Sequence, residues 1–206
     1  MDGLLFDTEE LYFEAMCGVT ATDGRLLSRE IYLTTAGFTW ECTHARLRQH
    51  FGETFPAEEF CERTRLSFNE LADTRLRLKG GMVEILDLLD ELRLPRAIAT
   101  SSMRSSVDHH LSAYQLRGRF DAVVAQGGYL HGKPHPAPYL SAAARLGVEP
   151  ADCLALDDSI NGVRSTAAAG MMTVMIPDLL LPTDEVHEAG ALVAESLHDV
   201  HRLLAP

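Results

Sequence analysis

Two adjacent carboxylates end a short apolar run in the second half of the chain. The run 153–156 has the length of a buried strand and stops at Asp157 and Asp158, after which Ser159 can cap a helix. Neighbouring negative charges are unfavourable unless a positive charge lies beside them. At the carboxyl end of a strand in an open α/β sheet, a hard cation such as Mg²⁺ would supply that charge. The alternative is that Asp158 or Ser159 caps a helix and Asp157 is merely solvated. The other motifs of the chain have to decide between these two interpretations.

Four further residues could complete a site for a phosphate group. Thr100 and Ser101 offer a hydroxyl and backbone N–H groups near an expected helix N-terminus, which suits an anion. Lys133 lies in a loop stiffened by prolines, and Asp2 is a carboxylate on an acid–glycine turn, suited to general acid–base catalysis. Taken alone, Thr100 and Ser101 could be an ordinary helix cap, Lys133 a solvated surface lysine and Asp2 part of a common turn. Together with the acidic pair they predict phosphoryl transfer, which depends on positioning and charge neutralisation.

Strands and helices alternate around these residues. We expect strands at 96–100, 121–125, 154–157, 172–176 and 191–194, and helices at 82–92, 104–114, 136–146, 160–168 and 197–204. This alternation predicts an α/β fold with a doubly wound parallel sheet and helices on both faces. The carboxyl ends of parallel strands share one edge, so Thr100 and Asp157 are expected close together.

The first third of the chain follows a different pattern. Helical periodicity runs through 8–22, 28–35, 40–50 and 56–76, with breaks at Gly24, Gly37 and Gly52 and no expected strand. Asp7 is expected to cap the first helix in a capping box with Glu10. We therefore expect an α/β core formed by 1–7 and 80–206 and an inserted all-helical domain at 8–79.

Composition limits the possible partners. The chain has 206 residues, a formal net charge of −12 and no cluster of Lys and Arg, so nucleic acid and anionic membranes are poor partners. Its four cysteines are widely spaced, which predicts buried thiols in a reducing compartment rather than a disulfide or zinc framework. We see no signal peptide and no membrane-spanning run, and we expect a cytoplasmic protein that is a monomer or a weak dimer.

Taken in order, these motifs resemble the haloacid dehalogenase (HAD) superfamily, in its branch of β-phosphoglucomutase-like phosphatases with a helical cap. The family pattern Asp-x-Asp-Gly-x-x-x-Asp-Thr is matched from Met1 to Thr8 except for its first Asp. The later motifs are a strand-ending Thr or Ser, a Gly-Lys-Pro-x-Pro lysine and an acidic pair, matched at Thr100, Lys133, Asp157 and Asp158. The resemblance covers essentially the whole chain and implies a HAD-like, Rossmann-type core with an inserted cap.

The resemblance also implies an activity and a role for each residue. It implies a Mg²⁺-dependent phosphomonoester hydrolase that acts on a small phosphorylated metabolite, a sugar phosphate or a nucleotide, through an aspartyl-phosphate. Asp2 would be the general acid–base and a Mg²⁺ ligand through its backbone carbonyl. Thr100, Ser101 and Lys133 would bind the phosphoryl group, and the acidic pair would hold Mg²⁺. The cap would set specificity and exclude water.

The sequence departs from the family at its start. The family's first Asp is the nucleophile and follows a central strand, between the strands that end at Thr100 and Asp157. Met1 occupies the position after that Asp, so we expect the flanking strands to keep unpaired backbone groups and the rate to fall by on the order of 10⁴–10⁶. One alternative is therefore a catalytically impaired chain. A phosphomutase is a weaker alternative, because Tyr12 and Trp40 stand where mutase relatives carry His and Arg.

Overall fold

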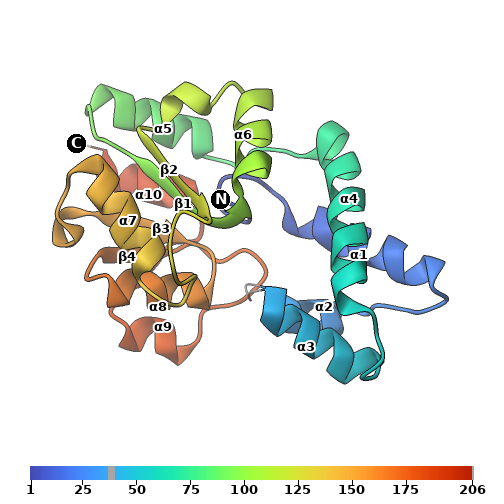
Figure 1. Cartoon of the computed structure of the whole chain (residues 1–206). Helices are drawn as coiled ribbons and strands as arrows, with labels where there is room; N and C mark the ends of the chain where they lie inside the picture. The colour runs from blue at the N-terminus through green and yellow to red at the C-terminus, as the bar shows by residue number, and fades with distance from the viewer. Residues whose placement is uncertain (37–39, 206) are drawn as a thin grey trace. The chain divides into compact units, whose positions relative to one another are not determined.

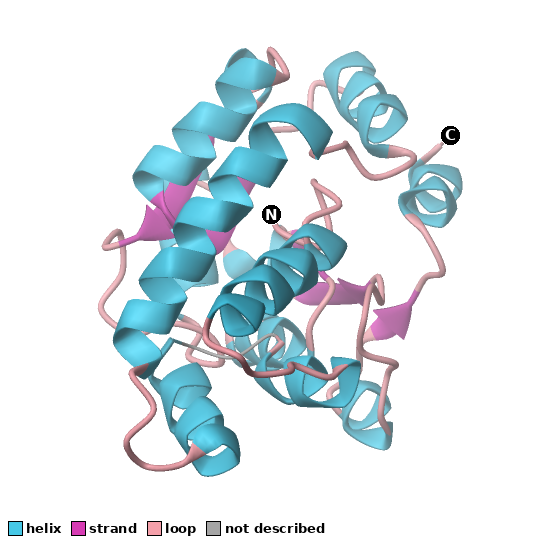
Figure 2. Ribbon diagram, turned by 90° about the vertical axis from the view of Figure 1, so that its right-hand side faces the viewer, coloured by secondary structure: helices cyan, strands magenta, loops and turns pink. Residues whose placement is uncertain are grey.

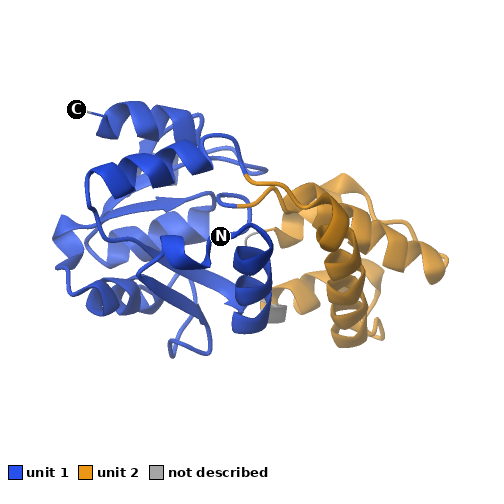
Figure 3. Ribbon diagram, turned by 90° about the horizontal axis from the view of Figure 1, so that it is seen from above, with its two compact units in different colours: residues 1–5, 79–206 blue, residues 6–78 orange. Residues whose placement is uncertain are grey.

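The computed structural model describes residues 1–36 and 40–205, with the side chains of Trp40 and Glu41 left undescribed. The chain divides into two compact units, Met1–Leu5 with Lys79–Pro206 and Phe6–Leu78, which Figure 3 shows in different colours. The expected break at Gly37 lies outside the described residues, as does the side chain of Trp40. Each unit is described separately below.

The larger unit alternates short strands with helices, as the sequence predicts (Figure 1). Its elements are α5 (Met82–Glu91), β1 (Ala97–Met103), α6 (Arg104–Ala113), β2 (Ala122–Gln126), α7 (Ala137–Leu146), β3 (Leu154–Asp157), α8 (Ile160–Ala168), β4 (Met172–Met175), α9 (Asp184–Glu188), β5 (Leu192–Val193) and α10 (Leu197–Leu204). Short 3₁₀ helices at Arg117–Arg119 and Pro150–Asp152 precede β2 and β3. All strand pairs given by these elements are parallel. The expected α/β class is confirmed.

The strands form two sheets instead of the one that the alternation predicts. β1 pairs with β2, and β3, β4 and β5 pair in that order; within residues 1–36 and 40–205, no strand is hydrogen-bonded between β1 and β3. The two sheets nevertheless share packing, because α7 packs against β1, β2 and α8. Tyr139 of α7, Ala155 of β3 and Ala169 form a buried cluster against which Ala99 of β1 packs. Apolar burial therefore joins β1 and β3 without backbone pairing between them.

The end of β1 differs from the expected boundary at Thr100. The strand continues to Met103, and its pairing with β2 shifts between Ala99, which is opposite Val124, and Met103, which is opposite Gln126. Four residue steps on β1 thus correspond to two on β2, the mark of a bulge. Thr100 consequently lies in an irregular strand end that leads directly into α6.

The smaller unit is helical, as predicted, and contains α1 (Glu9–Thr22), α2 (Arg29–Thr35), α3 (Trp40–Phe51) and α4 (Ala57–Arg75). α1 packs on α4, with the rings of Tyr12 and Phe68 stacked at 3.8 Å between centroids. The expected capping box of Asp7 and Glu10 is wrong. The N-cap of α1 is Thr8, which makes no side-chain capping bond, and Glu10 instead pairs with Arg29.

The chain leaves and re-enters the larger unit through two neighbouring segments. Phe6 and Leu78 form an isolated antiparallel bridge, and Lys79 N–H donates to Leu5 O at 3.1 Å. These bonds keep the two ends of the helical insertion side by side.

The cysteines and the helices bear on two further expectations. The cysteines are free thiols; Cys61 is buried but Cys42 is exposed, so the expectation of buried thiols holds only in part. Among the described helices, coloured cyan in Figure 2, none combines the length and apolar character needed to cross a bilayer.

Candidate active site

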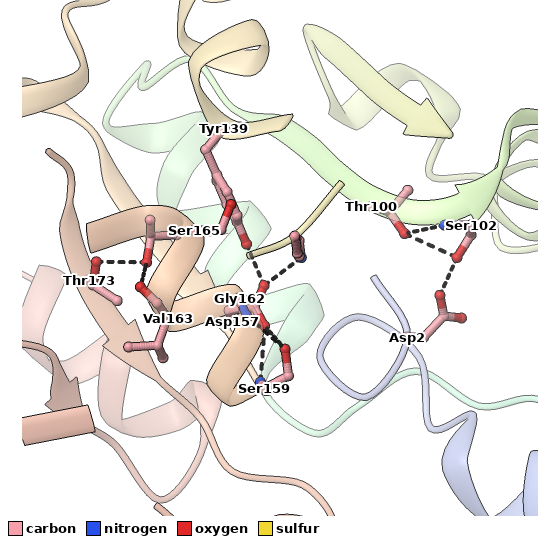
Figure 4. Close-up of polar contacts among 12 residues, drawn as sticks. Asp2, Thr100, Ser102, Tyr139, Asp157, Ser159, Gly162, Val163, Ser165 and Thr173 are labelled. Carbon is pink, nitrogen blue, oxygen red and sulfur yellow. Dashed lines mark hydrogen bonds and ion pairs between the residues drawn. The ribbon is translucent and has the colours of Figure 1, made fainter. Parts of the chain in front are cut away.

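Asp157, at the carboxyl end of β3, is buried and hydrogen-bonded through both of its oxygens (Figure 4). Its Oδ2 accepts hydrogen bonds from Lys133 Nζ at 2.6 Å and from the hydroxyl of Tyr139. Its Oδ1 accepts from the backbone N–H of Ser159 at 2.9 Å and from the Ser159 hydroxyl at 2.8 Å. Ser159 is also the N-cap of α8, so the helix start and the carboxylate hold each other in place.

The contact between Lys133 and Asp157 fixes the charge of both groups. Burial alone would raise the pKa of Asp157, but the Lys133 ammonium and the hydrogen bonds from Lys133 and Tyr139 together outweigh burial and lower that pKa to about 2. Burial also opposes the charge on Lys133, yet the carboxylate raises the pKa of the lysine above its usual value. Burial raises the pKa of Tyr139. At neutral pH the site therefore contains an ion pair and a neutral tyrosine hydroxyl.

Lys133 keeps hydrogen-bonding capacity beyond this pair. It lies in the loop between β2 and α7, its side chain is 14% exposed, and its ammonium lies 5.0 Å from the ring centroid of Tyr139. A lysine ammonium has three N–H donors, and in the described part of the chain it bonds to the Asp157 carboxylate and interacts with the Tyr139 hydroxyl. At least one donor is thus left for an anion.

A second hydrogen-bonded group contains Asp2, Thr100 and Ser102 (Figure 4). The Ser102 hydroxyl donates to the Asp2 carboxylate, and the Thr100 hydroxyl donates to Ser102 Oγ at 3.0 Å. Ser102 N–H donates back to Thr100 Oγ1 at 3.2 Å. Thr100 is buried, whereas the Ser101 side chain is exposed and takes no part in these bonds. The run of three hydroxyl residues pointed to this strand end in the sequence, and the structure adds that Ser102 is the residue that holds Asp2.

Two contacts connect these groups within the larger unit. The Tyr129 hydroxyl donates to the backbone carbonyl of Thr100 at 3.1 Å, which ties the loop that carries Lys133 to the end of β1. Gly3 lies so close to Asp158 that a Cβ added to the glycine would be 2.3 Å from Asp158 Oδ2. Its φ of +68° also favours glycine. Of the residues that the sequence singles out, the structure brings together all except Ser101.

The carboxylates beside Gly3 have the donor type that Mg²⁺ prefers. Asp178 bonds to Lys79 Nζ through Oδ1 at 2.7 Å, and its buried Oδ2 has no partner. That oxygen and Asp158 Oδ2 lie within 3.2 Å of the position that a Gly3 Cβ would take. No cluster of three or more His, Cys, Asp and Glu able to enclose an ion occurs among the described residues. Mg²⁺ keeps several waters and needs only one or two carboxylates, so these residues fit it. No local pattern pointed to Asp178.

Comparison with known proteins identifies the family. The sequence model of the haloacid dehalogenase-like hydrolases matches residues 1–176, and the chain belongs to this family of enzymes. Hexitol phosphatase B of Escherichia coli K12 is 33% identical over 179 residues, which are 86% of this chain and 81% of the relative. The phosphorylated carbohydrates phosphatase of Thermotoga maritima is 29% identical over 99% of this chain and 95% of its own.

A solved structure shows the same architecture. A HAD family hydrolase of Deinococcus radiodurans R1, crystallised with bound phosphate and sodium, superposes with a TM-score of 0.78 at 27% identity. The match covers 100% of this chain and 92% of that chain.

Proposed function

We propose that this protein is a Mg²⁺-dependent phosphomonoester hydrolase for a small phosphorylated carbohydrate. The observation that carries the proposal is the buried ion pair of Lys133 and Asp157, which keeps the lysine charged and leaves it an N–H donor for an anion. Tyr129, in the loop that carries Lys133, donates a hydrogen bond to the backbone carbonyl of Thr100. We therefore assign the Thr100 hydroxyl to the same site as Lys133. The names of the E. coli and T. maritima relatives favour a sugar phosphate over a nucleotide as substrate.

Each residue has a role that follows from its surroundings. Lys133 binds phosphoryl oxygens, the Thr100 hydroxyl would rotate from Ser102 Oγ to donate to them, and the backbone N–H of Ser101 adds a further donor. Asp2, held by Ser102, gives a proton to the leaving-group oxygen and later takes one from water. Asp158 would hold Mg²⁺, whereas Asp157, which the family pattern also assigns to the cation, already accepts hydrogen bonds from Lys133, Tyr139 and Ser159. When bound, the cation would neutralise charge on the phosphoryl oxygens.

Two parts of the proposal come from the family pattern. That pattern places the nucleophilic Asp immediately before the position of Met1, with Asp2 on the far side of that methionine. The helical unit Phe6–Leu78 corresponds to the cap, and we propose that it selects the substrate and excludes water.

Phosphate release tests the proposed function. The protein is incubated with p-nitrophenyl phosphate and with panels of sugar phosphates and nucleoside monophosphates, first with Mg²⁺ and then with EDTA. We expect release that requires Mg²⁺, with sugar phosphates preferred, at a rate lower by on the order of 10⁴–10⁶ for protein that starts at Met1. Binding of inorganic phosphate is measured in parallel by calorimetry. Binding without release would favour the catalytically impaired alternative, and neither binding nor release would overturn the proposal.

A further inference from the structure

Asp178, in the loop after β4, is a carboxylate that none of the sequence motifs includes. Its Oδ1 accepts a hydrogen bond from Lys79 Nζ at 2.7 Å, and its side chain is 14% exposed. Its Oδ2 is buried and accepts no hydrogen bond from any residue that the structure describes. A buried carboxylate oxygen without a donor is costly, so this oxygen is suited to a cation or to water bound to one.

The same oxygen lies beside the carboxylate that we propose as the Mg²⁺ ligand. A Cβ added to Gly3 would be 2.3 Å from Asp158 Oδ2 and 3.2 Å from Asp178 Oδ2. Both carboxylates therefore approach one point on the backbone, where glycine has no side chain. Gly3 directly follows Asp2, whose backbone carbonyl the family pattern assigns to the cation. Two carboxylates and a carbonyl are the hard oxygen ligands that Mg²⁺ takes.

The other member of the acidic pair is already engaged by the protein. Both oxygens of Asp157 accept hydrogen bonds, so a cation bound there has to share these oxygens with protein donors. Asp158 supplies one further negative charge next to a divalent ion. Asp178 adds a second carboxylate, and among the described residues no donor competes for its Oδ2.

We propose that Asp178 is a further residue of the Mg²⁺ site, with its Oδ2 directed at the hydrated cation and its Oδ1 fixed by Lys79. The inference rests on the proposed function for the identity of the cation. Mg²⁺ keeps several of its waters, and a carboxylate oxygen is a strong acceptor for them. Lys79 has the opposite electrostatic effect, because its ammonium is bonded to the same carboxylate and repels a cation.

Calorimetric titration with MgCl₂, without substrate, tests the inference and requires no turnover. Asp178→Asn is expected to weaken Mg²⁺ binding by about tenfold, because a charged acceptor beside the cation is lost. Lys79→Met is expected to strengthen binding by about threefold, because a positive charge is removed and the carboxylate is kept. Both variants break the same ion pair, so a merely structural pair would not change Mg²⁺ affinity in opposite directions.

The matched control is Asp23→Asn in the helical unit. Asp23 is also partly buried, at 22% exposed, and is paired with Arg63 at 3.0 Å. Its loss removes the same charge from the protein and is expected to change Mg²⁺ affinity less than about twofold. Melting temperatures in EDTA and in Mg²⁺ give a second measurement. The rise that Mg²⁺ produces is expected to shrink in Asp178→Asn and to persist in Asp23→Asn.

The outcomes separate the inference from the function on which it rests. If the wild-type protein binds Mg²⁺ and Asp178→Asn binds it equally well, the role of Asp178 is overturned and the proposed function stands. Lys79→Met protein that binds Mg²⁺ no more tightly than the wild type would also overturn it, even where Asp178→Asn does not fold. Wild-type protein that binds no Mg²⁺, alone or with inorganic phosphate, would overturn the Mg²⁺ dependence of the proposed function itself.

Discussion

At the scale of single residues, the candidate site depends on close packing around Asp157. Gly162 on α8 lies against this carboxylate, so that an added Cβ would be 1.8 Å from Oδ1. No relaxed side chain tolerates such a contact, and the neighbouring bonds to Ser159 leave the carboxylate little freedom to move. A glycine inside a helix, which costs stability relative to alanine, is required here by the carboxylate.

Gly162→Ala is expected to destabilise the protein by about 3 kcal/mol and to weaken phosphate binding. Helix propensity alone would make alanine more stable by up to about 1 kcal/mol, so the steric contact has to outweigh it. Urea unfolding measures the change. Gly18→Ala in α1 is the matched control, because a Cβ there meets no atom within 4 Å and should stabilise. A Gly162→Ala protein as stable as the wild type would refute the close contact.

Asp157 also predicts how stability responds to acid. Its folded-state pKa of about 2 lies below the ordinary 3.8, so the ionised carboxylate stabilises the folded state above pH 4. That stabilisation is lost as the pH falls from about 4 to about 2, when the group loses its charge-assisted bonds to Lys133, Tyr139 and Ser159. The lowering corresponds to about 2 kcal/mol.

The test compares wild-type protein with Asp157→Asn in EDTA by urea unfolding at several pH values. The wild-type advantage in free energy of unfolding is expected to shrink by about 2 kcal/mol between pH 5 and pH 2. An advantage that is constant over this range would show that the carboxylate is not held ionised by its neighbours.

At the scale of elements, helix starts and loops carry the site residues into place. Two of the described helices have a serine N-cap with a side-chain bond: Ser28 accepts from Ile31 N–H at 3.3 Å, and Ser159 accepts from Gly162 N–H at 3.0 Å. Of these two serines, Ser159 also donates to Asp157. The two caps therefore form a natural pair for separating helix capping from site geometry.

Ser28→Ala is expected to cost about 1 kcal/mol, the usual loss of an N-cap. Ser159→Ala is expected to cost about 2–3 kcal/mol, because a hydrogen bond to an ionised carboxylate is lost as well. Only Ser159→Ala should reduce phosphate affinity. Urea unfolding and phosphate titration of both variants measure these changes, and equal costs would mean that the bond to Asp157 adds nothing.

At the scale of the whole molecule, the split of the strands into two sheets is the main departure from a single doubly wound sheet. β1 and β3 share the core around Tyr139 but are not hydrogen-bonded to each other, within the residues that the structure describes. The family pattern has one strand between them, directly before the position of Met1. A strand there would give backbone partners to both neighbours.

An engineered N-terminal extension tests this reading. A segment of about five β-branched residues ending in Phe-Asp, fused before Met1, is expected to raise the melting temperature by several degrees and to increase Mg²⁺-dependent phosphate release. The control extension has equal length, is rich in Gly and Ser, and ends in Asn. If both extensions leave the melting temperature unchanged, no strand position is open between β1 and β3.

The sequence by itself determined the α/β class and the helical insertion, and it singled out the candidate residues of the site. Those features follow from local chemistry: apolar runs of strand length, helical periodicity, glycine turns and carboxylates at a strand end. Tertiary structure alone decided that Tyr139 and Tyr129 tie the loops together, that Asp178 lies beside Asp158, and that β1 continues past Thr100. These contacts join residues far apart in the chain, and they arise from the packing of α7 and the strand ends, which no local pattern encodes.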